Sequence, residues 1–309
     1  MNGFINVLKP PGMTSHDVVN FIRRLLGIKK VGHTGTLDPG AAGVLLICLG
    51  GATRLAGFLI DEDKEYRAEI TFGIATRSGD AFGEVTGEKD ASGLREEDVR
   101  AALSHFHGKI IQVPPMTSAI KLHGKKLYQL ARAGLEVDRP GRVVNINSLE
   151  FVGGYDWGTP HPRTLLHLSC SKGTYVRSLC LDIGSRLGCG AHMSFLVRTA
   201  VGPYRISESL TLEEIKILKE ENTLLEKVIN IDEALSALPA VLVKSGAVPS
   251  VLSGAKLYPP GVAKLPGGLN EGARVRLIGP AGFLAVAETT CDTQDMARLV
   301  FKPVCVLPR

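Results

Sequence analysis

The sequence predicts an α+β protein with two domains: a large domain in which helices flank a large β-sheet, and a small domain that resembles a β-barrel. Helix signals and strand-like alternation of apolar and polar residues are interspersed through the first three quarters of the chain. Near residue 238 this mixture gives way to short apolar runs separated by Gly and Pro, which is typical of closely spaced strands. The length of 309 residues also exceeds that of a usual single domain.

Three helices are predicted in the large domain from their end signals. The first would begin at Ser15 as N-cap, carry apolar residues at helical spacing and end at Gly27, which tolerates the left-handed backbone of a helix end. The second would cover about 94–107. The third would follow Thr211, because Glu214 stands three residues later and completes a capping box.

Alternating patterns predict strands in both parts of the chain. In the large domain they lie at residues 67–73, 142–151 and 164–170. In the C-terminal part the apolar runs cover residues 241–243, 275–278, 283–287 and 299–306. Short strands at this spacing favour a small barrel of roughly 70 residues. We therefore expect a large domain over residues 1–237 and a small domain over residues 238–309.

Composition excludes several classes of protein. With 44% hydrophobic and 22% charged residues, the chain is neither disordered nor fibrous. No apolar stretch reaches the roughly 18 residues of a membrane helix, and the N-terminus MNGFINVLKPPG lacks the pattern of a signal peptide, so we expect no membrane contact and a cytoplasmic protein. The six cysteines form no CxxC pair, which predicts reduced, mostly buried thiols and neither a zinc site nor a redox motif.

The net charge of +5 is unevenly distributed along the chain. Residues 1–60, 101–204 and 240–309 are positive, whereas the intervening segments are negative. The positive blocks could fold into one basic face that binds a phosphate backbone. Alternatively, the charges alternate over the surface without such a role.

A glycine-rich polar loop precedes an apolar run in VGHTGTLDPGAAGVLLICLG, residues 31–50. Glycines in such a loop permit unusual backbone angles or the close approach of a ligand, and His33, Thr34, Thr36 and Asp38 form a short-armed polar cluster between them. Taken alone, an Asp before a Pro is more typical of a turn than of a catalytic residue.

Five segments in the same order resemble the TruB family of pseudouridine synthases. The most characteristic is GHTGTLDP at residues 32–39. The others are LKPPGMTS (8–15), KEY (64–66), PPMTSAIKLHGKKLYQLAR (114–132) and CSKGTYVRSLCLDIG (170–184), the last followed by CGAH and FLVRTAVGPY. Because they span roughly residues 4–205, the resemblance is far more specific than one short pattern. It implies the pseudouridine-synthase fold, with a large mixed β-sheet flanked by helices.

The resemblance implies an isomerase that converts one uridine in the T-loop of tRNA, at position 55, to pseudouridine. Such an enzyme breaks the N-glycosidic bond, turns the base and joins ribose C1′ to C5 of the ring. Nothing is added or removed, so the resemblance implies no cofactor and no metal, and the sequence contains neither a GxGxxG nor a P-loop pattern. Whether the essential carboxylate attacks C1′, adds to C6 or starts the reaction by proton abstraction stays open.

The resemblance assigns the catalytic roles to Asp38, Tyr66 and Arg177. A buried carboxylate tends to keep its proton, and a neighbouring cation favours the ionised form. Arginine suits this task because its planar guanidinium stays charged and can make two bonds to a carboxylate. By the same resemblance Tyr66 stacks on the target base and assists removal of the proton from C5.

The target uridine must leave the RNA stack to reach a buried carboxylate. In the resemblance His33 fills the space that the base vacates, and Leu196 belongs to the pocket. Lys9, Thr14 and Ser15 are expected to support the floor of the site. Lys64 is expected either to support its strand or to contact the RNA. The other residues expected to contact RNA are Gly32, Thr34, Lys121, Lys125, Lys126, Arg132, Arg142, Lys172 and Arg198.

The resemblance also suggests how the remaining RNA is bound. The basic segment at about 113–142 matches an insertion that closes over RNA, although its apolar residues would equally suit a solvated amphipathic helix. The C-terminal part resembles a PUA domain, which would contact the acceptor end of tRNA, and we expect a monomer. Two residues depart from the family pattern: Val197 replaces the first Arg of a frequent pair, and Ala42 replaces a frequent Thr.

Three alternatives remain at the level of sequence. A guide-RNA-dependent pseudouridine synthase shares these motifs, but the basic insertion of this chain favours action without a guide. An RNA-binding or RNA-folding protein without catalysis is disfavoured by the presence of Asp38, Tyr66 and Arg177. A hydrolase that uses Asp38 lacks a second acidic residue at an evident spacing.

Overall fold

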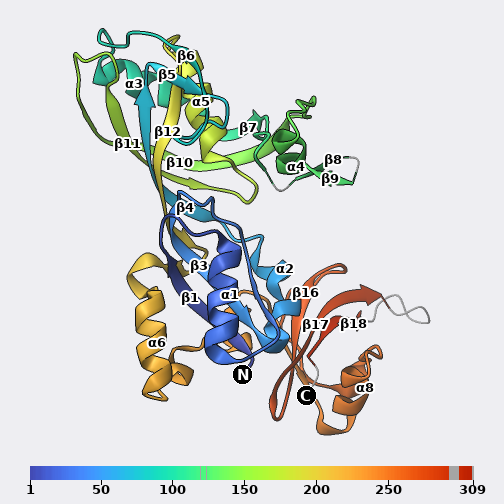
Figure 1. The fold of residues 1–309 in the computed structure, drawn as a ribbon. Coiled ribbons are helices and arrows are strands. Elements are labelled where there is room, and N and C mark those ends of the chain that lie inside the picture. Colours follow the sequence, from blue (N-terminus) through green and yellow to red (C-terminus); the bar gives the residue numbers. More distant parts are fainter. Residues whose placement is uncertain (119, 123, 292–298, 308–309) are drawn as a thin grey trace.

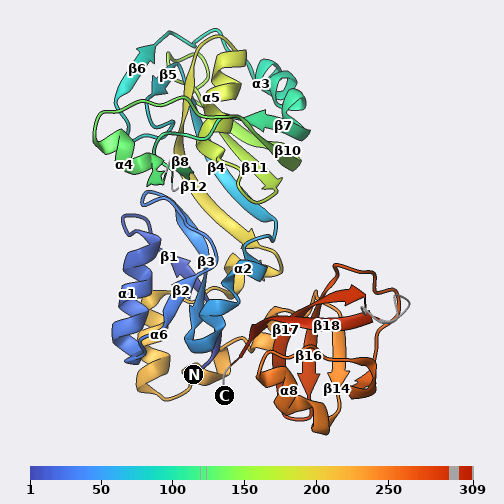
Figure 2. The same cartoon turned by 90° about the vertical axis from the view of Figure 1, so that its right-hand side faces the viewer.

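The computed structural model of the protein describes residues 1–118, 120–122, 124–291 and 299–307. Figures 1 and 2 show an elongated body of two lobes joined by long strands, and a smaller C-terminal domain beside the lobe that holds the N-terminus. In the described part of the chain no helix has the length and apolar character needed to span a membrane.

A nine-stranded sheet runs through both lobes in the order β1-β3-β12-β4-β11-β10-β7, with β2 added to β3 and β13 added to β12. Its strands pair antiparallel except β12 and β3, which pair in parallel, so the sheet is mixed as predicted. The long strands β4 and β12 pass from one lobe to the other (Figure 1). The strands are β1 (Gly3–Lys9), β2 (Val31–His33), β3 (Ala42–Leu49), β4 (Lys64–Phe72), β7 (Gly108–Gln112), β10 (Arg142–Tyr155), β11 (Arg163–Cys170), β12 (Ala191–Val201) and β13 (Tyr204–Arg205).

Helix α1 (Ser15–Leu26) packs beside β2 and ends at Gly27, which adopts the predicted left-handed backbone at φ 65°. Its N-cap, however, is Thr14 and not Ser15. Thr14 forms a capping box with Asp17, whereas the hydroxyl of Ser15 is turned inward and bonds the backbone of Leu37. A local signal cannot distinguish these two adjacent hydroxyl residues, because the choice depends on a contact distant in sequence.

The other predicted helices are confirmed with changes at their ends. The second is shorter than expected, since α3 (Glu96–Leu103) continues only as a 3-10 turn to Phe106. The third, α6 (Leu212–Glu220), begins with the predicted capping box of Thr211 and Glu214. The remaining helices are α2 (Ala56–Leu59), α4 (Leu127–Arg132), α5 (Val176–Arg186), α7 (Ile231–Ala234) and α8 (Val248–Leu252).

Two short hairpins stand outside the large sheet. Strands β5 (Ile74–Thr76) and β6 (Val85–Glu88) form one of them, in the loop that follows β4. Strands β8 (Lys121–Leu122) and β9 (Lys125–Lys126) form the other. It lies with α4 at the side of the second lobe, which is the lobe that does not hold the N-terminus (Figure 1). Both hairpins therefore belong to the lobe that lies away from the N-terminus.

The C-terminal domain contains a five-stranded sheet in the order β15-β14-β16-β17-β18. All four predicted apolar runs fall in its strands, which are β14 (Ala240–Val243), β15 (Val262–Lys264), β16 (Arg274–Gly279), β17 (Gly282–Cys291) and β18 (Leu299–Val306). The domain has its own core, which includes Val241, Val275, Leu277 and Phe301.

The C-terminal domain also shares a hydrophobic cluster with the N-terminal strands. Val286 of β17 is fully buried in one cluster with Phe4 and Leu46, and Leu307 packs against the same cluster. An ion pair of 2.6 Å between Arg276 and Asp232 adds a polar contact. Because of these contacts, removal of the C-terminal domain would expose apolar surface of the large domain.

All six cysteines are unpaired, as predicted. Cys48, Cys170 and Cys180 are buried, whereas the other three are half-buried. Burial raises the pKa of the buried Cys48 thiol to about 12, so this group is an inert core residue and not a nucleophile.

Candidate active site

Asp38 lies in the loop between β2 and β3, and buried polar groups beneath it fix that loop. The Ser15 hydroxyl accepts a hydrogen bond of 2.9 Å from the backbone N–H of Leu37 and contacts its carbonyl at 3.2 Å. Lys9, which is fully buried, donates from Nζ to the carbonyl of Ala41 at 2.7 Å. The predicted supporting roles of Ser15 and Lys9 are therefore confirmed, and burial lowers the pKa of Lys9 to about 8.

Arg177 and Asp38 meet as an ion pair although they are 139 residues apart in sequence. Arg177 Nη2 donates to Asp38 Oδ1 at 3.2 Å, and Nε lies 2.8 Å from Oδ2. The N–H of Nε does not point at that oxygen, so only the first contact is a hydrogen bond. The guanidinium is buried, whereas 36% of the Asp38 side chain is exposed. The carboxylate is thus held from inside while one side stays accessible.

Asp80 and Thr117 complete the surroundings of Arg177. Its Nη1 lies 3.7 Å from Asp80 Oδ2 and donates to the Ser78 carbonyl and to the Thr117 hydroxyl. Its Nη2 also donates to the Thr117 carbonyl. Neither Asp80 nor Thr117 was predicted as a site residue. Thr117 lies in the segment 114–132 that resembles the family, but its contact with Arg177, like that of Asp80, depends on where two separate loops meet around one guanidinium.

The pKa of Asp38 is raised above its ordinary value of 3.8, mainly because burial disfavours the charged form. Arg177 opposes this shift, whereas the nearby carboxylate of Asp80 adds to it. The site therefore holds an acid whose ionisation depends on Arg177.

This shift predicts that activity has an acid limb centred above pH 3.8. As the pH falls through the raised pKa, Asp38 gains a proton, and turnover should stop if Asp38 is the ionised essential carboxylate that the family resemblance implies. The measurement is the rate of pseudouridine formation with enzyme in excess, followed from about pH 4 to pH 8, with tRNA binding measured at each pH as a control. A rate that stays constant down to about pH 4 would contradict a raised pKa.

Tyr66 lies on β4 next to Arg198 on β12 and is 8% exposed. Burial raises the pKa of its phenol, while Arg198 opposes the shift by its charge and by a hydrogen bond. Tyr66 is therefore a neutral hydrogen-bonding group near neutral pH. Leu196 lies in the same hydrophobic cluster as Tyr66 and Leu37, so strand pairing brings the predicted aromatic and aliphatic residues to the Asp38 loop.

Arg198 is not placed to contact RNA, contrary to the prediction. It is 2% exposed, and its guanidinium donates to the carbonyls of Val44, Gly35 and Thr36 at 2.8, 3.1 and 3.4 Å. All three nitrogens are used within the protein. Arg198 therefore supports the Asp38 loop, in the manner of Lys9.

Lys64 and Thr34 are likewise not placed to contact RNA. Lys64 is 8% exposed and donates from Nζ to the carbonyls of Ile60 and Glu62. Burial lowers its pKa to about 8. Thr34 is 3% exposed, and its backbone N–H donates to Leu46. Both residues support the strands around the site, because their side chains turn into the protein.

His33 ends strand β2, one residue after Gly32, and both are half-buried. Burial and the neighbouring Arg198 lower the pKa of His33, so its ring is neutral at physiological pH. Its buried Nδ1 has no hydrogen-bond partner among the residues that the structure describes. No local hydrogen bond to a described residue therefore holds the ring at this nitrogen.

The predicted basic contacts lie at several places around the second lobe. Lys125 and Lys126 belong to β9, and Lys126 Nζ lies 5.6 Å from the Tyr128 ring centroid. Arg142 is exposed at the start of β10. Lys172 is exposed and forms a 2.6 Å ion pair with Asp61. The side chains of Lys121 and Arg132 lie outside the described part of the chain.

The two departures from the family pattern lie side by side. Ala42 of β3 and Val197 of β12 are Cα partners in the parallel strand pair. Next to them, Gly43 adopts φ 113°, and a Cβ there would lie 2.2 Å from the Arg198 carbonyl oxygen. The two strands therefore require glycine at residue 43, and the apolar side chains of Ala42 and Val197 lie beside it.

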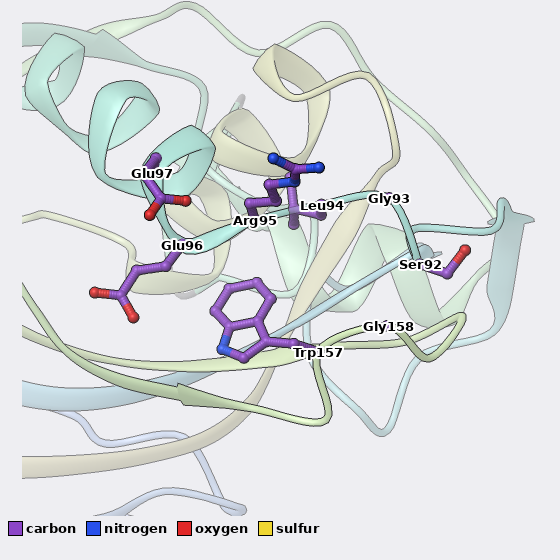
Figure 3. Close-up of a pocket in the computed structure, with 8 residues that line it drawn as sticks. All are labelled: Ser92, Gly93, Leu94, Arg95, Glu96, Glu97, Trp157 and Gly158. Atoms are coloured by element: carbon purple, nitrogen blue, oxygen red, sulfur yellow. The ribbon is translucent and has the colours of Figure 1, made fainter.

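A separate pocket of about 400 Å³ lies at the start of α3 and contains no residue of the Asp38 site. Figure 3 shows the indole of Trp157 below the start of that helix, with the carboxylates of Glu96 and Glu97 nearby. These carboxylates would repel a phosphate backbone. Within the described residues, no group of three or more His, Cys, Asp or Glu side chains could hold a metal ion.

Comparisons with protein families cover nearly the whole chain. A model of the N-terminal domain of TruB family pseudouridylate synthases matches residues 23–176, one of the tRNA pseudouridylate synthase B C-terminal domain matches residues 177–237, and a PUA domain model matches residues 239–304. A tRNA pseudouridine synthase B from Pelotomaculum thermopropionicum is 62% identical, with 100% of this chain and 98% of the relative covered. The corresponding protein from Moorella thermoacetica is 44% identical, with 99% of each covered.

Solved structures resemble the whole chain as well. One in a Cbf5-Nop10-Gar1 complex has a TM-score of 0.75 at 30% identity and covers 99% of this chain and 85% of that chain. Another, in an H/ACA RNP bound to a substrate RNA containing 2′-deoxyuridine, has a TM-score of 0.74 at 29% identity, with 99% and 85% covered. Together with the mixed sheet, these matches confirm the predicted fold class and the C-terminal PUA domain.

Proposed function

The chain belongs to the TruB family of pseudouridylate synthases and is a tRNA pseudouridine synthase, an isomerase, and on this basis we propose that its target is the T-loop uridine at position 55 of tRNA. The observation that carries this proposal is the ion pair of Asp38 with the buried Arg177, next to Tyr66. This arrangement supplies an accessible carboxylate with a fixed cation behind it, as isomerisation at a glycosidic bond requires.

In the proposed reaction, Asp38 is the ionised carboxylate that acts on the extruded uridine. The bond between N1 and C1′ breaks, the uracil ring turns, and a bond between C5 and C1′ forms. Loss of the C5 proton and protonation of N1 complete the isomerisation, so atoms balance without a cofactor. We assign Tyr66 to stacking on uracil and Leu196 to an apolar wall beside it, and their place in one hydrophobic cluster with Leu37 of the Asp38 loop supports this assignment.

Extrusion of the uridine leaves a gap in the T-loop that we assign to His33. A neutral, half-buried ring with an unpartnered Nδ1 among the described residues can stack on bases without bringing a desolvated charge into the RNA. A Cβ at the neighbouring Gly32 would lie 3.7 Å from Cγ2 of Thr53, an ordinary van der Waals contact. We assign contacts with the phosphate backbone to the basic segment 113–142, through Lys121, Lys125, Lys126, Arg132 and Arg142, and to Lys172.

We divide the chain into a catalytic domain at residues 1–237 and an RNA-binding PUA domain at residues 238–309. The PUA domain would contact the acceptor end of the tRNA. The protein would act as a monomer in the cytoplasm, where its tRNA substrate is made. The family resemblance and the charge distribution support these assignments.

Two other functions, a guide-RNA-dependent synthase and an RNA-binding protein without catalysis, are less well supported. Action within a guide-RNA particle is suggested by the similarity to Cbf5 complexes, but the relatives with 62% and 44% identity over nearly the full length are tRNA pseudouridine synthases. A purely RNA-binding role is disfavoured by the Asp38 and Arg177 pair, because an ion pair of this kind is not needed for binding.

The proposal is tested by mapping pseudouridine in unmodified tRNA transcripts after incubation with the purified protein alone. We expect conversion of the T-loop uridine at position 55, in whole tRNA and in a T-arm stem-loop. Conversion at another position would refute the assigned target, and a requirement for added guide RNA would favour the alternative.

A further prediction concerns the PUA domain. Because its removal would expose the shared hydrophobic cluster, we choose surface changes at the exposed Lys256 and Lys264. Replacing both with Ala should weaken binding of whole tRNA and lower its salt slope by roughly 1.5 to 2, the effect of two lost phosphate contacts. Binding of a T-arm stem-loop should not change. The control is replacement of Lys219 and Lys227, which are exposed on the large domain; equal losses for both pairs would contradict the assignment.

A further inference from the structure

The turn that follows β5 carries an aromatic side chain that belongs to none of the hydrophobic clusters in the described part of the chain. Phe82 is 81% exposed, more than any other large hydrophobic side chain in the described part of the chain. A phenyl ring in water forgoes the stabilisation that burial of an aromatic residue normally provides. Such exposure is a reason to look for a ligand when the ring lies next to an active site.

The ring of Phe82 lies against the loop that carries Asp38. A Cβ at Gly40 would lie 2.2 Å from Cε2 and 2.9 Å from Cζ of the Phe82 ring. Gly40 follows Asp38 by two residues, so the edge of the ring rests on the backbone of the catalytic loop while most of its surface faces solvent. A side chain at residue 40 would displace the ring from this contact.

The turn is held rigidly by groups that also flank Arg177. Asp80 Oδ1 accepts hydrogen bonds from the backbone N–H of Phe82 at 3.1 Å and from the Ser78 hydroxyl at 2.6 Å. Its other oxygen, Oδ2, lies 3.7 Å from Arg177 Nη1. The neighbouring Ala81 donates to the carbonyl of Met193 on β12. Asp80 thus fixes the backbone of Phe82 relative to the guanidinium of Arg177.

We propose that Phe82 is a substrate-binding residue whose exposed ring stacks on a tRNA base next to the extruded uridine; this inference rests on the proposed function. An aromatic face accepts any base, because every base has a π-face, and needs no hydrogen bond. Tyr66 is buried in the pocket and serves the uridine itself, whereas Phe82 lies at the rim. The ring therefore serves binding of the flanking RNA and not the bond-breaking step.

The test measures pseudouridine formation on a T-arm stem-loop with enzyme in excess, as a function of enzyme concentration. For Phe82→Ala we expect the half-saturating concentration to rise roughly 5- to 150-fold, the loss of one base stack, with the maximal rate within about threefold of wild type. Phe82→Leu should behave like Phe82→Ala, whereas Phe82→Tyr and Phe82→Trp should retain wild-type values. The matched control is Leu225→Ala, which removes a side chain that is 63% exposed on the N-terminal lobe.

The variants separate stacking from a structural role. If Phe82→Leu restored binding, or if thermal melting showed a lower Tm for Phe82→Ala than for Leu225→Ala, the ring would be an apolar cover for the Gly40 loop and the inference would fail. An unchanged half-saturating concentration in Phe82→Ala would also overturn it, and would leave the exposed ring to contact a protein. A wild-type protein that left the T-loop uridine unmodified would instead refute the proposed function, and this inference with it.

Discussion

Replacement of Asp38 with Asn is expected to lower the rate of pseudouridine formation by at least roughly 10⁴-fold while tRNA binding stays within a few-fold of wild type. The amide has nearly the shape of the carboxylate but carries no charge and cannot act on the sugar or the base. The contact with Arg177 Nη2 can persist, because an amide oxygen still accepts a hydrogen bond. The measurements are the rate with enzyme in excess and the affinity for tRNA by filter binding.

The matched control for this variant is Asp90→Asn. Asp90 is exposed and accepts a hydrogen bond from the backbone of Ser92, which an amide oxygen can replace. We expect wild-type turnover from it. Substantial product from Asp38→Asn, with a thermal transition like that of the wild type, would show that the reacting group is elsewhere.

Replacement of Arg177 with Lys is expected to lower the rate by roughly 10²- to 10³-fold, which is the usual effect of removing one preorganised partner from an active site. A lysine keeps the charge but has one nitrogen, so it cannot hold Asp38 and also satisfy Thr117 and the Ser78 carbonyl. Unfolding free energy should fall by roughly 1–3 kcal/mol, because buried acceptors lose their donor. The checks are single-turnover kinetics and thermal denaturation.

The matched control for Arg177→Lys is Arg186→Lys. Arg186 lies on the same helix, α5, but is exposed, so the same substitution should change neither rate nor stability by a measurable amount. A wild-type rate in Arg177→Lys would refute the pairing with Asp38. A loss of stability without a loss of rate would reduce Arg177 to a structural residue.

Much of the fold follows from signals that act within a few residues. The capping box at Thr211 predicted the start of α6, and Gly27 predicted the end of α1, because both features satisfy the backbone of their own helix. Alternation of apolar and polar residues predicted β4, β10 and β11, since one face of each strand packs on the core. The wrong N-cap at Ser15 marks the limit of such signals.

The candidate site was predictable only where a motif carried it. Resemblance pointed to Asp38 and Arg177, and the structure brings their side chains together. The family resemblance did not indicate that the Arg198 side chain is buried, and no sequence pattern marked Asp80 or Phe82. These properties depend on which strands pair and which loops meet.

The sequence by itself determined the class of fold, the two-domain composition and the loop that holds Asp38, because local backbone preferences and hydrophobic periodicity are written into neighbouring residues. Only the tertiary structure decided which charged side chains are buried as supports and which remain exposed. That choice depends on the parallel pairing of β12 with β3 and on the meeting of loops from β2, β5 and β7 around one guanidinium. Burial and charge there depend on residues up to 163 apart, beyond the reach of any local pattern.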